Sequence, residues 1–137
     1  MPVCQIDHIA VTAPTLAAGV DWVQQVLGVA PQGGGEHVAM GTHNRLLRLD
    51  DTMYLEVIAI NPAAPAPDQA RWFGLDLLEP DAAPRLRTWI ARSDEIERLA
   101  AGAGETLGRI ASWPCCRPWG SKVRCRRAAR QRARDRR

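Results

Sequence analysis

Apolar and polar positions alternate with a period of two near the start of the chain. In Ile6–Thr12, IDHIAVT, one side of an extended chain carries His8 and the other carries Asp7. This alternation predicts a β-strand of about seven residues. After the break at APT, apolar residues recur at helical spacing from Leu16 to Leu27. Thr15 precedes them as a candidate N-cap and Gly28 follows them, so we predict a helix between these two residues.

Three further strand-like runs precede residue 61. They are EHVAM at 36–40, RLLRL at 45–49 and MYLEVIAI at 53–60, with GTHN and DDT as predicted connections. The proline-rich segment NPAAPAP then ends the pattern, because a central strand does not tolerate it. The first sixty residues therefore predict the order strand, helix, strand, strand, strand.

The same order begins again in the second half of the chain. WFGLDL at 72–77 fits neither period well, LRTWIA at 86–91 predicts a strand, and SDEIERLAAGAGE at 93–105 predicts a helix. Nothing after Leu107 supplies the three further strands that would complete the repeated pattern. The whole pattern indicates an α+β fold in one domain, residues 1–110, with a first module at about 5–60 and a partial second module at about 70–110.

Charge and cysteine separate the last 27 residues from the rest. Residues 1–110 hold 8 Arg and 14 acidic residues, a net charge of −6, whereas residues 111–137 carry a net charge of +9 and three of the four cysteines. Two interpretations of 111–137 stay open. One is a disordered basic arm, and the other, which we favour, is a segment read out of its native frame in a GC-rich gene.

Several classes of protein are excluded by these features. No apolar run approaches the ~20 residues that span a bilayer, and the N-terminus lacks the pattern of a secretion signal, so we expect a cytoplasmic protein without a membrane partner. The cysteines lack the paired C-x-x-C spacing of zinc ribbons. Nucleic-acid binding is not expected, because the basic tail carries no recognised binding motif.

Four segments resemble the glyoxalase-like domain family of the vicinal-oxygen-chelate (glyoxalase/bleomycin-resistance/dioxygenase) superfamily. They are IDHIAV, the helix ending in LG, GGGEHVAMGTHNRLLRL and YLEVIAI, and the resemblance covers about residues 5–108. It implies βαβββ modules that enclose a sheet-lined cleft, with the second module of this chain cut short. It also implies a divalent metal ion on His8 and Glu56, and an imidazole with a carboxylate suits Zn, Mn, Fe or Ni. We add His37 as a candidate third ligand.

Glu56 is the most informative of these residues. It shares one face of its predicted strand with Tyr54, and an unpaired carboxylate among apolar neighbours is costly. Three alternatives stay open: a ligand or base in the cleft, a partner for Arg45 or Arg48, or a position on the solvent face. His8 is either a metal ligand or a histidine satisfied by backbone and water.

The resemblance leaves the activity open between two classes. The first is metal-dependent isomerase, lyase or dioxygenase chemistry on a small oxygenated metabolite, with Glu56 as the catalytic residue. The second is a metal-free, drug-sequestering binding protein on the same fold. In either case we expect a homodimer, and we expect the ligand to be contacted by a further set of side chains: His43, Asn44, Arg45 and Tyr54.

Overall fold

The structure is a computed structural model that describes residues 4–103, 109–116 and 122–129, the last two ranges as backbone only. The chain divides into two compact units. One runs from His8 to Arg87, and the other combines the residues up to Asp7 with those from Thr88 onward. Strand β1, Cys4–Thr12, contributes residues to both units.

Helix α1, Leu16–Leu27, begins and ends where the sequence predicts. The hydroxyl of Thr15 accepts a hydrogen bond from the backbone N–H of Ala18, which satisfies one of the free N–H groups of the first turn. Gly28 adopts a left-handed conformation, and its N–H donates to the carbonyl of Gln24. Local sequence alone therefore fixes both ends of this helix.

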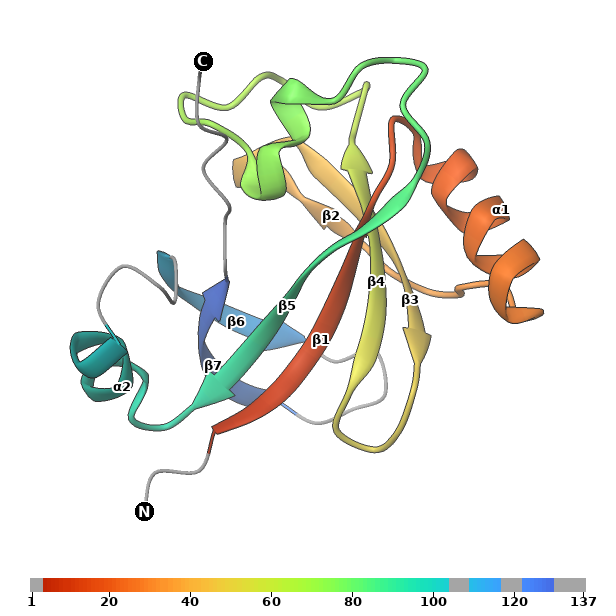
Figure 1. Cartoon of the computed structure of the whole chain (residues 1–137). Coiled ribbons are helices and arrows are strands. Elements are labelled where there is room, and N and C mark those ends of the chain that lie inside the picture. Colours follow the sequence, from red (N-terminus) through yellow and green to blue (C-terminus); the bar gives the residue numbers. More distant parts are fainter. Residues whose placement is uncertain (1–3, 104–108, 117–121, 130–137) are drawn as a thin grey trace. The chain divides into compact units, whose positions relative to one another are not determined.

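The unit His8–Arg87 contains a sheet in the order β2-β3-β4-β1 (Figure 1). Its further strands are β2, Glu36–His37, β3, Thr42–Arg48, and β4, Tyr54–Ile60. β4 lies parallel to β1 and antiparallel to β3. Strand, helix and three strands form the predicted βαβββ module, so the predicted α+β fold is confirmed.

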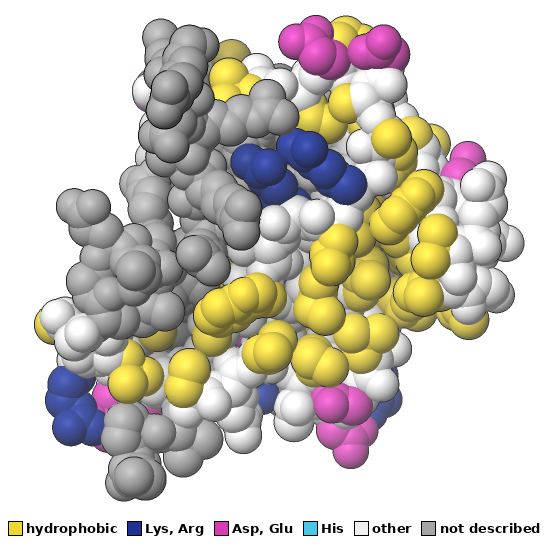
Figure 2. Space-filling view, in the orientation of Figure 1, with side chains coloured by type: hydrophobic (Ala, Val, Ile, Leu, Met, Phe, Trp, Pro, Cys, Tyr) yellow, Lys and Arg dark blue, Asp and Glu magenta, His cyan; other side chains and the backbone are white. Residues whose placement is uncertain are grey.

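One face of this sheet packs against α1 (Figure 1). Its core consists of Val11, Val23, Leu55 and Val57, and partly buried hydrophobic side chains pack around it. Period-two alternation on β1 and β4 sends these strand residues to the α1 side. Figure 2 shows hydrophobic side chains gathered on the surface beside α1.

The largest differences from the predicted strands lie between residues 36 and 45. EHVAM is a strand only at Glu36–His37, and Val38–Met40 form a 3₁₀ turn, η1, that ends at the left-handed Gly41. GTHN is not a connection, because β3 already begins at Thr42. A segment as short as EHVAM does not by itself separate a strand from a turn. The start of β3 is set instead by its pairing with β4, which begins at Thr42.

WFGLDL, the segment that fitted neither period, forms a second 3₁₀ segment, η2, Trp72–Leu77. Phe73 and Gly74 lie inside it with left-handed backbone angles, φ 59° and φ 68°. A buried phenylalanine in this conformation has no signature in the sequence, because non-glycine residues rarely adopt it.

The other unit contains β5, Arg85–Ser93, from Thr88 onward, and α2, Ile96–Ala103, as predicted. β6, Arg109–Cys116, and β7, Lys122–Ala129, follow, and the strand order in this unit is β1-β5-β7-β6. Two strands therefore follow Leu107 in the described residues, where the sequence carries no signal for the three that would complete a second module. Here antiparallel pairing gives strands to a segment whose composition favours neither strand nor helix.

Within this unit Arg92 donates to the fully buried carboxylate of Asp7 over 3.0 Å, and to the side chain of Gln5. Among the residues that the structure describes, no helix is long and apolar enough to cross a membrane.

Candidate functional site

The candidate site lies on the sheet face that points away from the core under α1. The strand register sets His8 beside Tyr54, Ala10 beside Glu56, and Asn44 beside Ile58. Paired residues point to the same face, and residues two apart on one strand share that face. Four polar side chains from three strands therefore meet on it: His8, Asn44, Tyr54 and Glu56.

Glu56 is the centre of this arrangement. Its Oε2 atom lies 3.1 Å from Nε2 of His8, and its Oε1 atom accepts a 2.7 Å hydrogen bond from Nδ2 of Asn44. The side chains of His8 and Glu56 are only 3% and 7% exposed. The partners of Glu56 are therefore His8 and Asn44, and neither Arg45 nor Arg48 is among them, which rules out the predicted alternative of an arginine pair.

The pKa of Glu56 shows how these contacts act on the carboxylate. Burial, the largest influence, raises the pKa, because a charged carboxylate loses its hydration. The hydrogen bond and charge of His8, the hydrogen bond from Asn44 and the charge of His37 outweigh burial. Together they lower the pKa from 4.5 to about 2. Glu56 is therefore a fixed negative charge at neutral pH.

The orientation of Asn44 follows from the glycine-rich turn that precedes β2. The backbone N–H of Gly35 donates to Oδ1 of Asn44 over 2.8 Å, so Nδ2 is the atom that faces Glu56. The turn approaches β3 closely at Gly34, whose φ is 127°. A Cβ atom on Gly34 would lie 2.1 Å from the carbonyl oxygen of Asn44. Glycine at position 34 is thus required for the turn that orients Asn44.

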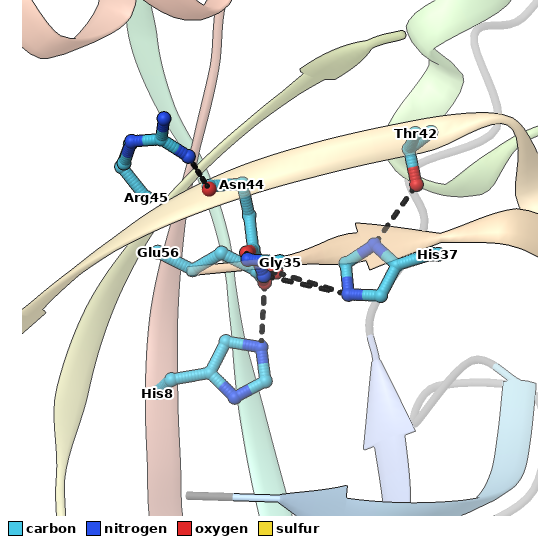
Figure 3. Close-up of polar contacts among 7 residues, drawn as sticks. All are labelled: His8, Gly35, His37, Thr42, Asn44, Arg45 and Glu56. Carbon is cyan, nitrogen blue, oxygen red and sulfur yellow. Dashed lines mark hydrogen bonds and ion pairs between the residues drawn. The ribbon is translucent and has the colours of Figure 1, made fainter. Parts of the chain in front are cut away.

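His37 on β2 lies at the more exposed end of this network (Figure 3). Its Nδ1 is 2.9 Å from the hydroxyl of Thr42, and its Nε2 is 3.4 Å from Nδ2 of Asn44 and 4.0 Å from Oε1 of Glu56. Nδ2 of Asn44 can only donate, so a neutral His37 ring would accept this contact at Nε2 and carry its proton on Nδ1. The His37 side chain is 29% exposed, against 7% for Glu56.

We call His8, His37, Asn44 and Glu56 the polar cluster. Two aromatic side chains border it. The ring of Tyr54 stacks on His8 with centroids 4.6 Å apart, and Trp72 of η2 meets His37 edge-to-face at 5.3 Å. Sequence reasoning missed Trp72, because nothing in the segment WFGLDL links it to a histidine 35 positions earlier.

His43 and Arg45 do not join the cluster. They alternate with Asn44 along β3 and pair with Ala59 and Val57, so they share the face that packs on α1. Arg45 is exposed and donates to the backbone carbonyl of Asn44, and Figure 3 shows its side chain directed away from the cluster. Burial and the charge of Arg45 lower the pKa of His43, against the opposing effect of Glu36.

The donor atoms fit a metal ion only in part. Two ligands of one ion, each about 2.1 Å from it, lie about 3.0–3.4 Å apart, and the 3.1 Å between His8 Nε2 and Glu56 Oε2 falls in this range. Across the residues with described positions, however, no three His, Cys, Asp or Glu side chains are grouped so that they could hold a metal. His8 and Glu56 would supply two ligands to such an ion, and His37 is not grouped with them as a third.

A protein-family model for the glyoxalase-like domain matches residues 6–135, nearly the whole chain. The chain belongs to the glyoxalase-like domain family. This agrees with the βαβββ module and with the predicted vicinal-oxygen-chelate superfamily. Neither curated proteins nor solved structures gave a match to the chain.

Membership in the glyoxalase-like family associates this chain with the small-molecule binding of its superfamily. The reaction, the metal, the homodimer and the cytoplasmic location stay predictions. The match extends into the basic segment 111–137, and the interpretation of that segment as out of frame also stays a prediction.

Proposed function

We propose that this glyoxalase-like protein binds a small, uncharged, hydroxyl-bearing metabolite at the polar cluster, with His37 as the residue that the ligand meets first. Three features support the proposal: family membership, the ionised and buried Glu56, and the partly exposed His37 bonded into the same network.

The observation that carries the proposal is the position of His37. Thr42 holds the Nδ1 side of the ring, which directs Nε2 towards Asn44 and Glu56. The 3.4 Å contact from Asn44 is long for a hydrogen bond, so a ligand hydroxyl at 2.7–2.8 Å would be the better donor. His37 therefore accepts from the ligand in this proposal.

Glu56 sets the charge preference in the same proposal. A buried carboxylate that keeps its charge repels anions and favours groups that donate hydrogen bonds. Its own oxygens are already held by His8 and Asn44, which keep it in place with no further rearrangement when a ligand arrives. The chain's residues thus bind and orient the ligand, and exclude carboxylates and phosphates.

Hydroxyacetone, which is small, uncharged and bears a hydroxyl group, serves as the probe in ligand-observed NMR titrations. We expect binding to the wild-type protein that weakens at least about tenfold in His37→Ala, the loss of one hydrogen bond to an organised site. The matched control is Arg45→Ala on the opposite face of β3, which should bind as the wild type does. Equal binding by wild type and His37→Ala, or no binding by the wild type, contradicts the proposal.

A metal-dependent activity is the second candidate, and the 3.1 Å between His8 Nε2 and Glu56 Oε2 favours it. A divalent ion bound there would polarise a substrate carbonyl as a Lewis acid. In that case the role of Asn44 is to hold Oε1 of Glu56, so that Oε2 stays directed at His8.

Metal content after purification without chelators tests this candidate. We expect about one equivalent of a divalent metal in the wild-type protein, and loss of that metal in His8→Ala. Arg48→Ala serves as the control, because Arg48 lies at the exposed end of β3 and bonds to Asp50 and Asp51 of the turn that follows. Metal-free wild-type protein that also fails to take up added Zn²⁺, Mn²⁺, Fe²⁺ or Ni²⁺ contradicts it.

A further inference from the structure

We propose that Trp72 determines ligand specificity, by selecting ligands whose hydroxyl-bearing carbon is attached to a flat aromatic ring. This inference rests on the proposed function, since it assigns the class of ligand bound at the polar cluster. Trp72 touches His37 directly, with ring centroids 5.3 Å apart and an angle of 75° between the ring planes.

The position of Trp72 is fixed from both ends of η2. Before it, the backbone N–H and the guanidinium of Arg71 both donate to the carboxylate of Asp76, which closes the segment into a loop. After it, Nε of Arg87 donates to the carbonyl of Phe73 over 2.9 Å. Two arginines thus hold the backbone on either side of the indole.

The segment holds this shape at a cost. Phe73 adopts φ 59° and ψ 16°, and its side chain is buried. This left-handed backbone conformation is unfavourable for residues with a Cβ atom. Such strain persists where the surrounding contacts over-determine the backbone, and it gathers at ligand sites. Here the strained residue directly follows Trp72, and its burial turns the chain so that the indole lies against His37.

The indole is only partly buried, so part of its surface remains open to a ligand. Aromatic rings attract one another edge-to-face or offset, beyond the effect of buried area. A hydroxyl bound to Nε2 of His37 brings the carbon framework of the ligand next to this ring. An aromatic framework gains binding affinity from that contact, and a saturated framework gains less affinity.

Benzyl alcohol and cyclohexylmethanol form a matched pair of probes, because both carry one CH₂OH group on a six-membered ring. We expect the wild-type protein to prefer benzyl alcohol about three- to tenfold in Kd, the range given by one aromatic pair. In Trp72→Leu the two alcohols should bind equally, with little change for cyclohexylmethanol. Trp72→Phe should keep most of the preference.

The control is Leu77→Ala, an exposed position in the same 3₁₀ segment, which should leave the preference unchanged. A preference that survives Trp72→Leu overturns the inference. Equal binding of both alcohols to the wild type also overturns it, while hydroxyacetone binding that depends on His37 leaves the proposed function standing. If neither alcohol nor hydroxyacetone binds, both proposals fail.

Discussion

The two faces of the β1–β4–β3 sheet differ in kind, although they are built from alternate residues of the same strands. Towards α1 the strands present Val11, Leu55 and Val57, which pack with Val23 of the helix. Towards the other face they present His8, Glu56 and Asn44, which are equally well buried but joined by hydrogen bonds. One step along a strand therefore separates a face that stabilises the fold from a face that carries chemistry.

The difference between the two faces explains why a carboxylate is tolerated at position 56. Glu56 is about as buried as its neighbour Leu55, at 6% against 8% exposed, and the difference lies in the partners. Two donors surround Glu56, whereas the α1 face presents aliphatic side chains. Among these residues of the unit His8–Arg87, buried charge therefore lies on one face only, and each prediction below challenges that asymmetry.

The largest effect is expected from a carboxylate on the wrong face. Val11 is fully buried on the α1 side, and Val11→Glu places an ion there without a donor. We predict a loss of about 3–5 kcal/mol in the free energy of unfolding, or an unfolded chain. Urea denaturation measures this loss. The control Val26→Glu, at an exposed position on α1, should change stability by about 0.5 kcal/mol or less.

A smaller loss is expected when the carboxylate keeps its place but loses a donor. Asn44→Leu removes the 2.7 Å hydrogen bond to Glu56 and should cost about 1.5–3 kcal/mol, the range for a hydrogen bond to a charged group. Arg45→Ala, the next residue on the opposite face, is the control and should cost about 0.5 kcal/mol or less. Equal costs for the two variants would remove the distinction between the faces.

Acid should reduce the contribution that Glu56 on the site face makes to the free energy of unfolding. The pKa of Glu56 is lowered from its ordinary value of 4.5 to about 2 in the folded protein. The ionised carboxylate therefore makes its full contribution to the free energy of unfolding above pH 4.5. The contribution is lost as the pH falls from 4.5 to about 2, because the carboxylate of the unfolded chain takes up a proton in this range while that of the folded chain stays ionised. Denaturation of chelator-treated protein across this range should show wild type losing stability relative to Glu56→Gln. Parallel pH curves for the two proteins would contradict this.

The smallest predicted effect is a gain in stability, whereas the preceding variants lose stability. The hydroxyl of Thr12 is fully buried on the site face and has no hydrogen-bond partner among the described residues. Thr12→Val replaces it with a methyl group of the same shape, so we predict unchanged stability or a gain of up to about 1 kcal/mol. Thr42→Val is the comparison, because Thr42 is bonded to His37 and should lose stability. A clear loss in Thr12→Val would indicate that this hydroxyl is satisfied.

Much of the fold could be predicted because its signals are local. The cap at Thr15, the glycine at 28 and the alternation in YLEVIAI fix α1 and β4 without reference to the rest of the chain. The pairing of His8 with Glu56 was accessible only through family resemblance, because periodicity assigns each residue to a face but does not bring two strands together.

The missed features depend on distant parts of the chain. Asn44 was predicted to contact substrate or to shape a turn, and its bonds to Gly35 and Glu56 require β2 and β4 to lie on either side of it. β3 begins at Thr42, three residues earlier than predicted. His43 and Arg45 therefore alternate with Asn44 along this strand and lie on the α1 face. Trp72 reaches His37 through a left-handed phenylalanine, for which the sequence carries no sign.

The most direct test of the two-face account is methyl NMR mapping of the wild-type protein with hydroxyacetone. The methyl groups of Thr42 and Ile58 report on the site face, and those of Leu55 and Val57 report on the α1 face. We predict shift changes at Thr42 and Ile58 on binding, with Leu55 and Val57 unchanged. Changes confined to Leu55 and Val57 would contradict the account and move the ligand to the side of the sheet that α1 covers.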